Sequence, residues 1–270
     1  MTAASAPVVV ADPGDPRLLA FTGLTDTELR RRVEAEHGLF IVEGITAIER
    51  LLASPYSVHS FLLTERALDR LGDGPAATDA PIYVVGPDVL RAVVGFDLHR
   101  GAVAAALRPA PVDAATVLAG ASLVLGVEGV NDHENLGGLF RNAAAFGVDA
   151  VLLDPTCADP LYRRSVRVSM GHVLAVPFAR LAPWPDALGD LQEAGTTVVA
   201  LTPDPDAEPI DRVGPLPRPV LLVVGAEGPG LSAATLAGAD RRVRIPMAAG
   251  VDSLNVATAA AVALHRIGSS

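Results

Sequence analysis

The chain has 270 residues, of which 50% are hydrophobic and 19% charged, and its net charge is −10. This length and hydrophobic content are enough for one large or two modest hydrophobic cores, so we expect a folded protein. No apolar run reaches the roughly 18 residues that span a bilayer, and residues 1–12 lack the basic start and apolar stretch of a signal peptide, so we expect a cytoplasmic protein without a membrane segment. Cys157 is the only cysteine, which excludes an internal disulfide and a cysteine cluster, and we expect no metal.

The first 110 residues have the pattern of a small α/β domain. The predicted elements are a strand over residues 38–44, a helix from there to residue 52, strands over 60–64 and 82–85, and a helix over 88–94. Arg30, Arg31 and Arg32 form the one basic cluster of this part. Such a run is either a solvated helix face or a contact to RNA phosphates.

Two prolines within residues 107–113 interrupt the pattern and divide the chain into a domain over 1–110 and a domain over 118–270. In the second domain, helices separate most of the predicted strands, which are 122–127, 150–153, 174–178, 197–201, 220–224 and 242–245. This alternation predicts a mostly parallel sheet that helices cover on both faces. Ligands of such sheets bind beyond the carboxyl ends of the strands, and three segments there are informative.

The first segment, residues 132–142, follows the strand that ends near residue 127. We expect Asn135 to cap the next helix and Arg141 to lie within its first two turns, either as a surface ion-pair partner or as a functional cation. Gly137 and Gly138 favour a functional role. Glycine inside a helix costs about 1 kcal/mol relative to alanine, so it indicates that something approaches closely.

The second segment, residues 221–232, is a buried strand, a glycine-rich turn and a helix that Ser232 caps. It matches neither the dinucleotide-binding fingerprint nor the P-loop, and the chain contains no lysine. A plain turn explains Gly225 and Gly230, but not the carboxylate of Glu227 between them. We therefore expect the backbone here to approach a ligand closely.

The third segment, residues 244–257, is a strand that ends at a proline, a loop of small residues, and a helix that begins near Ser253. Residues 254–267 are apolar around nearly the whole helical circumference, which predicts a helix buried on all sides. Asn255 is then a polar group in an apolar setting that needs hydrogen-bond partners.

In their order and spacing, these segments closely resemble the three motifs of the SpoU (TrmH-like) family of SPOUT RNA methyltransferases. The matching residues are Asn135 with Arg141, GAEGPGL at 225–231, and IPM at 245–247 with SLNV at 253–256. SVRVSMG at 165–171 resembles a further family stretch, and FIVEG at 40–44 resembles the start of the small RNA-recruiting domain of many members. Position 257, usually serine in the family, is alanine here.

The resemblance implies an α/β fold in which a C-terminal SPOUT domain with a deep trefoil knot follows a small α/β RNA-binding domain. It also implies S-adenosyl-L-methionine as the cofactor, bent within the knot and held mainly by backbone groups. The residues that it assigns to cofactor binding are Leu201, Thr202, Gly225, Glu227, Gly230, Ile245, Met247, Ser253 and Leu254.

The implied reaction is attack of a ribose 2′-oxygen on the sulfonium methyl group. Arg141 is the residue that the family usually assigns to activating the hydroxyl. Because a guanidinium is too strongly protonated to be a comfortable base, we favour stabilisation of the developing oxyanion and leave proton abstraction open. Asn135 and Asn255 would orient the ribose and the arginine, and Glu227 would hold an arginine or a backbone turn.

The implied partner is RNA, although each half of the chain carries a net charge of −5, so that contacts must come from local clusters. The predicted RNA contacts are Arg30, Arg31, Arg32, Arg100, Arg167 and Ser169. We place 23S ribosomal RNA ahead of tRNA because the N-terminal part is a folded module. We also expect a homodimer, since residues 254–267 are too apolar to face water and family members dimerise.

Other functions stay open at this point. The chain could be a tRNA 2′-O-methyltransferase, or a non-catalytic RNA-binding or ribosome-assembly protein with the same fold. The presence of Asn135, Arg141 and Asn255 argues against a non-catalytic role. A nucleotide-binding α/β enzyme of another kind is a third alternative.

Overall fold

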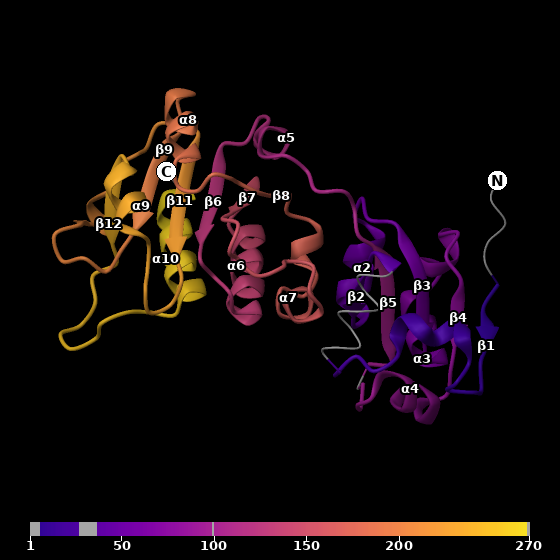
Figure 1. The fold of residues 1–270 in the computed structure, drawn as a ribbon. Coiled ribbons are helices and arrows are strands. Elements are labelled where there is room, and N and C mark those ends of the chain that lie inside the picture. Colours follow the sequence, from indigo (N-terminus) through magenta and orange to yellow (C-terminus); the bar gives the residue numbers. More distant parts are fainter. Residues whose placement is uncertain (1–5, 27–36, 99, 269–270) are drawn as a thin grey trace. The chain divides into compact units, whose positions relative to one another are not determined.

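The computed structural model describes residues 6–26, 37–98 and 100–268, and divides the chain into two compact units (Figure 1). Unit 1 comprises Met1–Ala110 and Leu161–Ala175, and unit 2 comprises Pro111–Pro160 and Val176–Ser270. No helix in the described ranges is long and apolar enough to cross a membrane.

Unit 1 contains a five-stranded sheet with the order β1-β4-β3-β5-β2. The strands are β1 (Val8–Val9), β2 (Leu39–Glu43), β3 (Val58–Leu63), β4 (Ile82–Val84) and β5 (Ala102–Leu107). The helices of residues 1–110 are η1 (Pro16–Phe21), α2 (Ile45–Leu52), α3 (Glu65–Leu71), η2 (Pro75–Ala77) and α4 (Pro87–Val94). β1, β4 and β3 are parallel, whereas β5 runs antiparallel to both β3 and β2.

Strand β5 is absent from the sequence prediction, although it lies inside the sheet between β3 and β2. Its sequence is AVAAAL, and alanine has the highest helix propensity of all residues. Every residue of the strand except Leu107 is buried. Pairing with a strand on each side therefore overrides the local helical preference, which no pattern within six residues can reveal.

The segment Leu161–Ala175 leaves the second half of the chain and packs in unit 1. It forms α7 (Arg163–Val168) and the short 3-10 helix η3 (His172–Leu174). Arg163 donates to Glu43 at 2.8 Å, and the two side chains are only 19% and 11% exposed. Gly171 has φ 82°, and a Cβ there would lie 2.9 Å from the Cα of Ala47, so the contact requires glycine.

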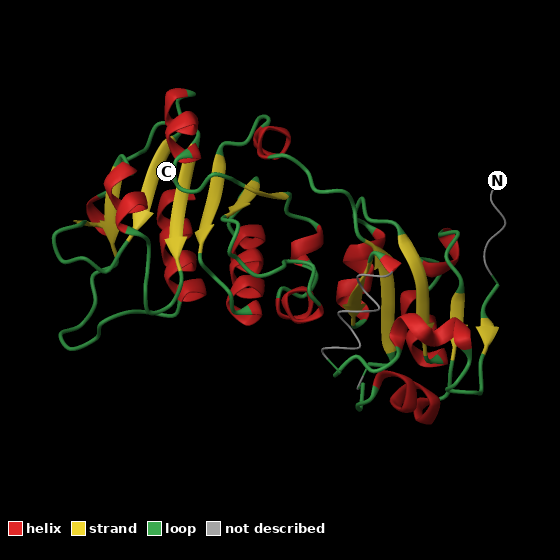
Figure 2. Ribbon diagram, in the orientation of Figure 1, coloured by secondary structure: helices red, strands yellow, loops and turns green. Residues whose placement is uncertain are grey.

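Unit 2 contains a seven-stranded sheet with the order β10-β12-β9-β11-β6-β7-β8, in which all neighbouring strands are parallel (Figure 2). The strands are β6 (Leu123–Glu128), β7 (Ala150–Leu153), β8 (Phe178–Arg180), β9 (Thr197–Leu201), β10 (Glu208–Pro209), β11 (Val220–Gly225) and β12 (Arg241–Arg244). The helices are α5 (Ala114–Leu118), α6 (His133–Ala145), α8 (Ala187–Glu193), η4 (Ile210–Arg212), α9 (Ala233–Gly238) and α10 (Val256–Gly268).

The predicted α/β class with a parallel sheet is confirmed, but the strand predicted over residues 174–178 is wrong. Residues 172–174 form η3, and β8 begins only at Phe178, directly after Pro177. The apolar run that suggested a strand forms a turn instead, in which only Leu174 and Val176 are buried. Apolar runs of this length do not distinguish a strand from other buried segments.

Helix α10 corrects a second expectation, because it is not buried on all sides. Val262 is 40% exposed, and Thr258 and His265 share its exposed face. The opposite face is buried: Val256, Ala260, Ala263, Leu264 and Ile267. Apolar composition alone therefore overstated the burial of this helix.

Helices α6 and α10 pack closely against each other in unit 2. A Cβ on Gly138 would lie 2.9 Å from the Cβ of Ala257, and Asn142 Nδ2 donates to the Ala257 carbonyl at 2.6 Å. The close approach that the glycine indicates is thus made by α10. The alanine at position 257 is part of this contact.

This packing predicts that Gly138→Ala destabilises the protein, although alanine normally stabilises a helix. Gly189 in α8 is the matched control, since a Cβ there meets nothing within 4 Å. We expect Gly138→Ala to lower the free energy of unfolding by about 1–2 kcal/mol, and Gly189→Ala to raise it by about 0.5–1 kcal/mol. Urea unfolding of both variants measures the difference, and equal stabilisation by both would contradict the proposed contact.

Candidate functional site

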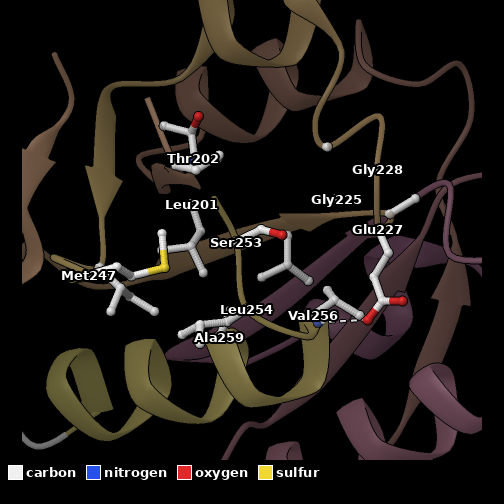
Figure 3. Close-up of a pocket in the computed structure, with 15 residues that line it drawn as sticks. Leu201, Thr202, Gly225, Glu227, Gly228, Met247, Ser253, Leu254, Val256 and Ala259 are labelled. Atoms are coloured by element: carbon white, nitrogen blue, oxygen red, sulfur yellow. Dashed lines mark hydrogen bonds between the residues drawn. The ribbon is translucent and has the colours of Figure 1, made fainter. Parts of the chain in front are cut away.

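The site is a pocket at the carboxyl ends of β9, β11 and β12 in unit 2, closed by the segment that leads into α10 (Figure 3). All nine residues predicted to bind the cofactor line it: Leu201, Thr202, Gly225, Glu227, Gly230, Ile245, Met247, Ser253 and Leu254. Pro203, Val224, Ala226, Gly228, Val256 and Ala259 complete the lining. Sequence reasoning missed these six, although each is a close neighbour in sequence of a predicted residue.

The turn after β11 is tightly folded on itself. A Cβ on Gly225 would lie 2.3 Å from the carbonyl carbon of Gly230 and 2.4 Å from the amide nitrogen of Leu231. The amide of Gly230 donates to the Ala226 carbonyl at 2.9 Å, and Gly230 has φ 69°. The turn's own backbone therefore requires glycine at position 225, and Gly225 and Gly230 also line the pocket.

A buried carboxylate fixes the far end of this turn. Glu128, at the end of β6, accepts from the amide of Ser232 at 2.9 Å and from Thr235 Oγ1 at 2.5 Å. Ser232 caps α9 as predicted, since its hydroxyl accepts from the Thr235 amide. Nothing in the sequence singled out Glu128, because a lone acidic residue at a strand end carries no local signal.

Asn255 is the centre of the polar contacts at the pocket. Its Nδ2 donates to Asn135 Oδ1 at 2.7 Å and to Glu227 Oε1 at 2.6 Å. Its Oδ1 accepts from the amides of Ala257 at 3.0 Å and Thr258 at 3.2 Å, which caps the start of α10. The side chain is exposed, so the expected apolar setting is wrong, but its hydrogen-bonding groups are all engaged.

Glu227 accepts hydrogen bonds at the start of α10 and does not pair with an arginine among the described residues. Besides Asn255 it accepts from the amide of Val256 at 3.4 Å, the contact drawn in Figure 3. Of the two roles expected from the sequence, the structure gives it the backbone one. The carboxylate links the turn after β11 to the first residues of α10.

Asn135 does not cap α6, because Asp132 does. Asp132 Oδ1 accepts from the amides of Glu134 and Asn135, both at 2.8 Å. The side chain of Asn135 is therefore free of the capping role and accepts from Asn255 instead. Its Nδ2 has no hydrogen-bond partner within the described part of the chain.

Arg141 lies on α6 with its side chain exposed, and it does not line the pocket. It makes no hydrogen bond or ion pair with any residue that the structure describes. Within one chain, the structure thus brings together Asn135, Asn255 and the cofactor residues, but not Arg141.

The predicted RNA contacts fall into three groups. Arg30, Arg31 and Arg32 lie outside the described residues. Arg100 and Arg167 are exposed and line one cavity of unit 1. Ser169 is fully buried and its hydroxyl donates to the Val166 carbonyl at 3.0 Å, so its side chain cannot reach an RNA at the surface. No group of three or more metal-ligating side chains occurs in the ranges described.

Comparisons with known proteins agree on one family. Residues 122–265 match the model of the SpoU rRNA Methylase family. An uncharacterised tRNA/rRNA methyltransferase of Mycobacterium tuberculosis is 50% identical over 260 residues, which cover 95% of this chain and 90% of that protein. The 23S rRNA (guanosine(2553)-2′-O)-methyltransferase RlmP of Bacillus subtilis is 29% identical over 228 residues, 84% of this chain and 88% of that one.

The fold also matches a solved structure along nearly its whole length. The SpoU methyltransferase AviRb of Streptomyces viridochromogenes, in complex with the cofactor AdoMet, has a TM-score of 0.78 at 24% identity. The match covers 94% of this chain and 98% of AviRb.

The contacts of Glu227 predict a specific effect on the start of α10. In Glu227→Ala, Asn255 and the Val256 amide lose an acceptor, and we expect amide exchange at Val256 to accelerate about fivefold or more, corresponding to about 1 kcal/mol. Glu227→Gln is the matched control, since its side-chain carbonyl still accepts and exchange stays close to the original rate. Hydrogen exchange followed by NMR measures both variants. An unchanged rate in Glu227→Ala would show that Glu227 does not hold this segment.

Proposed function

The chain belongs to the SpoU rRNA methylase family and is an RNA methyltransferase, and we propose that it methylates a ribose 2′-hydroxyl of 23S ribosomal RNA with S-adenosyl-L-methionine as the methyl donor. The observation that carries the proposal is the pocket, which collects all nine expected cofactor residues beside the contacts of Asn255. We place the enzyme in the cytoplasm and infer that α10 completes the trefoil knot of the family.

The pocket residues fit the proposed cofactor. Its walls are apolar at Leu201, Ile245, Met247 and Leu254, which suits an adenine ring and a thioether chain, and Glu227 is the only ionisable residue among the described residues that line it. The glycine-rich turn leaves backbone groups for the polar atoms of the ligand. When bound there, S-adenosylmethionine supplies a methyl group on a cationic sulfur that an oxygen nucleophile can displace in line. AviRb, of the same fold, was solved with this cofactor.

Asn135 is placed to position the ribose. Because its Oδ1 is occupied by Asn255, its Nδ2 is fixed as a donor on the side away from that contact. A donor at this position can hold an oxygen of the reacting nucleotide and so keep the 2′-hydroxyl within reach of the methyl group. Glu227 and the α10 cap hold Asn255, and Asn255 in turn holds Asn135.

Arg141 is assigned to stabilising the oxyanion that develops on the 2′-oxygen. Since it does not line the pocket of its own chain, we propose a homodimer in which each Arg141 serves the pocket of the other copy. The exposed face of α10, which includes Val262, is a suitable surface to be covered in such a dimer. A guanidinium supplied by a second copy would also bind the phosphate next to the reacting ribose.

Ribosomal RNA is preferred over tRNA for two reasons. RlmP, whose name states a defined product, acts on 23S rRNA, and the chain has a folded N-terminal unit in addition to the one that contains the pocket. The name of the mycobacterial relative leaves tRNA open. A non-catalytic role is disfavoured because Asn135, Arg141 and Asn255 are all present.

The direct test is methyl transfer by the purified full chain to an unmodified 23S rRNA transcript or to bulk tRNA, with 2′-O-methylated nucleotides mapped by mass spectrometry. We expect methylation of the 23S transcript. Arg141→Ala should lower the rate about 100- to 1,000-fold, as expected for an oxyanion stabiliser, while its affinity for S-adenosylmethionine stays within about twofold of the original. No cofactor binding by calorimetry would refute the enzymatic role, and activity on tRNA alone would refute the substrate.

The shared site predicts complementation between two inactive variants. Arg141→Ala has an intact pocket but lacks its arginine, and Asn255→Ala has the arginine but a damaged pocket. In a doubly tagged, purified heterodimer of the two, one site combines an intact pocket with an intact arginine, so we expect about half of the wild-type rate. The two variant homodimers are the controls. An inactive heterodimer would mean that Arg141 acts in its own chain, and a stable, active monomer in light scattering would exclude the dimer.

A further inference from the structure

Unit 1 contains a wide cavity of its own at the carboxyl ends of the parallel strands β3 and β4. It lies among α3, α4 and the residues that precede β5. The pocket of unit 2 does not involve any of these residues. In open sheets with parallel strands, ligands bind at this edge.

The lining of this cavity is basic in a chain that is acidic overall. It includes Arg66, Arg70, Arg91 and Arg100, against the two carboxylates Glu65 and Asp97. The lining thus carries four positive and two negative charges, whereas the chain carries −10. A local reversal of charge of this kind attracts an anion at short range.

Three of the four guanidinium groups are available for a ligand. Arg91 pairs with Asp88 at 2.9 Å and with Asp97 at 3.6 Å. Arg66, Arg70 and Arg100 are exposed and have no hydrogen bond or ion pair with the described residues. Structural arginines are normally paired, as Arg163 is with Glu43 elsewhere in the unit.

The arrangement suits a strand of phosphates better than a single one. Arg66 and Arg70 are four residues apart on α3, so they project from the same side of that helix one turn apart. Arg100 reaches the cavity from a different segment, just before β5. Guanidinium groups spread over successive positions match the repeated phosphates of a polynucleotide.

The rest of the lining offers apolar surface for sugars and bases. Val9 on the edge strand β1 is 78% exposed, and the partly buried Leu98 also contributes. A mixture of arginine and apolar surface is typical of sites for single-stranded RNA, in which unstacked bases contact side chains while the backbone contacts cations.

We propose that this cavity binds the sugar–phosphate backbone of an unpaired segment of the RNA substrate, with Arg66, Arg70 and Arg100 as the phosphate contacts. The inference rests on the proposed function, because it identifies where the protein binds the RNA substrate of unit 2. The cavity then contributes to affinity for RNA and takes no part in methyl transfer.

The test compares the full chain with the triple variant Arg66→Ala/Arg70→Ala/Arg100→Ala. Filter binding to a 23S rRNA transcript over a range of salt concentrations should show affinity reduced about tenfold or more, and a salt slope smaller by about 2, as expected for three lost contacts to a single strand. In methyl transfer, KM for the transcript should rise by a similar factor, while kcat and the affinity for S-adenosylmethionine stay within about twofold.

Two single variants control for charge and for position. Arg17→Ala removes the same charge from unit 1 outside the cavity, at a residue already paired with Asp15, and should leave the affinity for RNA unchanged. Glu65→Gln removes a negative charge from the cavity lining and should tighten binding. Thermal unfolding verifies that each variant is folded.

The outcomes separate this proposal from the proposed function. If the wild type transfers no methyl group, the proposed function fails, and the filter-binding comparison still decides the role of the cavity. If the triple variant keeps the wild-type affinity and salt slope, the cavity does not bind RNA. Calorimetry with ATP and with inorganic phosphate tests whether a small anion occupies the cavity instead. If the wild type binds ATP or phosphate, and the triple variant loses this binding but keeps its affinity for RNA, the proposal is overturned.

Discussion

The candidate site depends on how closely α10 can approach α6. Residue 138 has no side chain, and a Cβ there would lie 2.9 Å from that of Ala257. Asn142 on α6 then binds the Ala257 carbonyl at the first turn of α10. This contact brings the start of α10 beside the start of α6, which is where Asn255 meets Asn135. The polar contacts of the site are thus a consequence of helix packing, and a larger residue at 138 would separate them before any catalytic group was changed.

Two carboxylates hold the turn between β11 and α9 from opposite ends. Glu128 is buried and binds the amide and hydroxyl groups at the start of α9, whereas Glu227 is exposed and binds Asn255 and the start of α10. Between them Gly225 lets the turn fold against its own backbone. The lining of the pocket is therefore fixed by contacts among protein groups, which leaves the free backbone and apolar side chains for the ligand. A site of this kind needs little rearrangement when a ligand binds.

Much of this could be predicted from the sequence, because the informative residues lie at strand ends. The alternation of apolar runs and helices identified most strands of both sheets, and the resemblance of three segments to the family motifs assigned the residues that line the pocket. Three of the failures have a physical reason. β5 is alanine-rich and is a strand only because β2 and β3 flank it, Glu128 has no local pattern, and the cap of α6 is Asp132 although Asn135 is an equally good capping residue type. Each depends on a partner far away in the sequence or on a choice between two similar residues.

The two units differ in where their charges lie, and the proposed RNA site in unit 1 would account for how an acidic protein acts on RNA. Among the described residues that line the pocket of unit 2, Glu227 alone is ionisable, so the pocket contributes no attraction for a polyanion. Arginines without a side-chain partner among the described residues instead line the cavity of unit 1 at Arg66, Arg70 and Arg100. Salt screens these exposed charges beyond about a Debye length, roughly 8 Å at physiological ionic strength, and the net charge of the chain is negative, so they would not attract RNA from a distance. Affinity then requires an RNA segment whose shape brings several phosphates to the arginines at once, and a requirement for shape makes binding selective where a uniformly basic surface would not be.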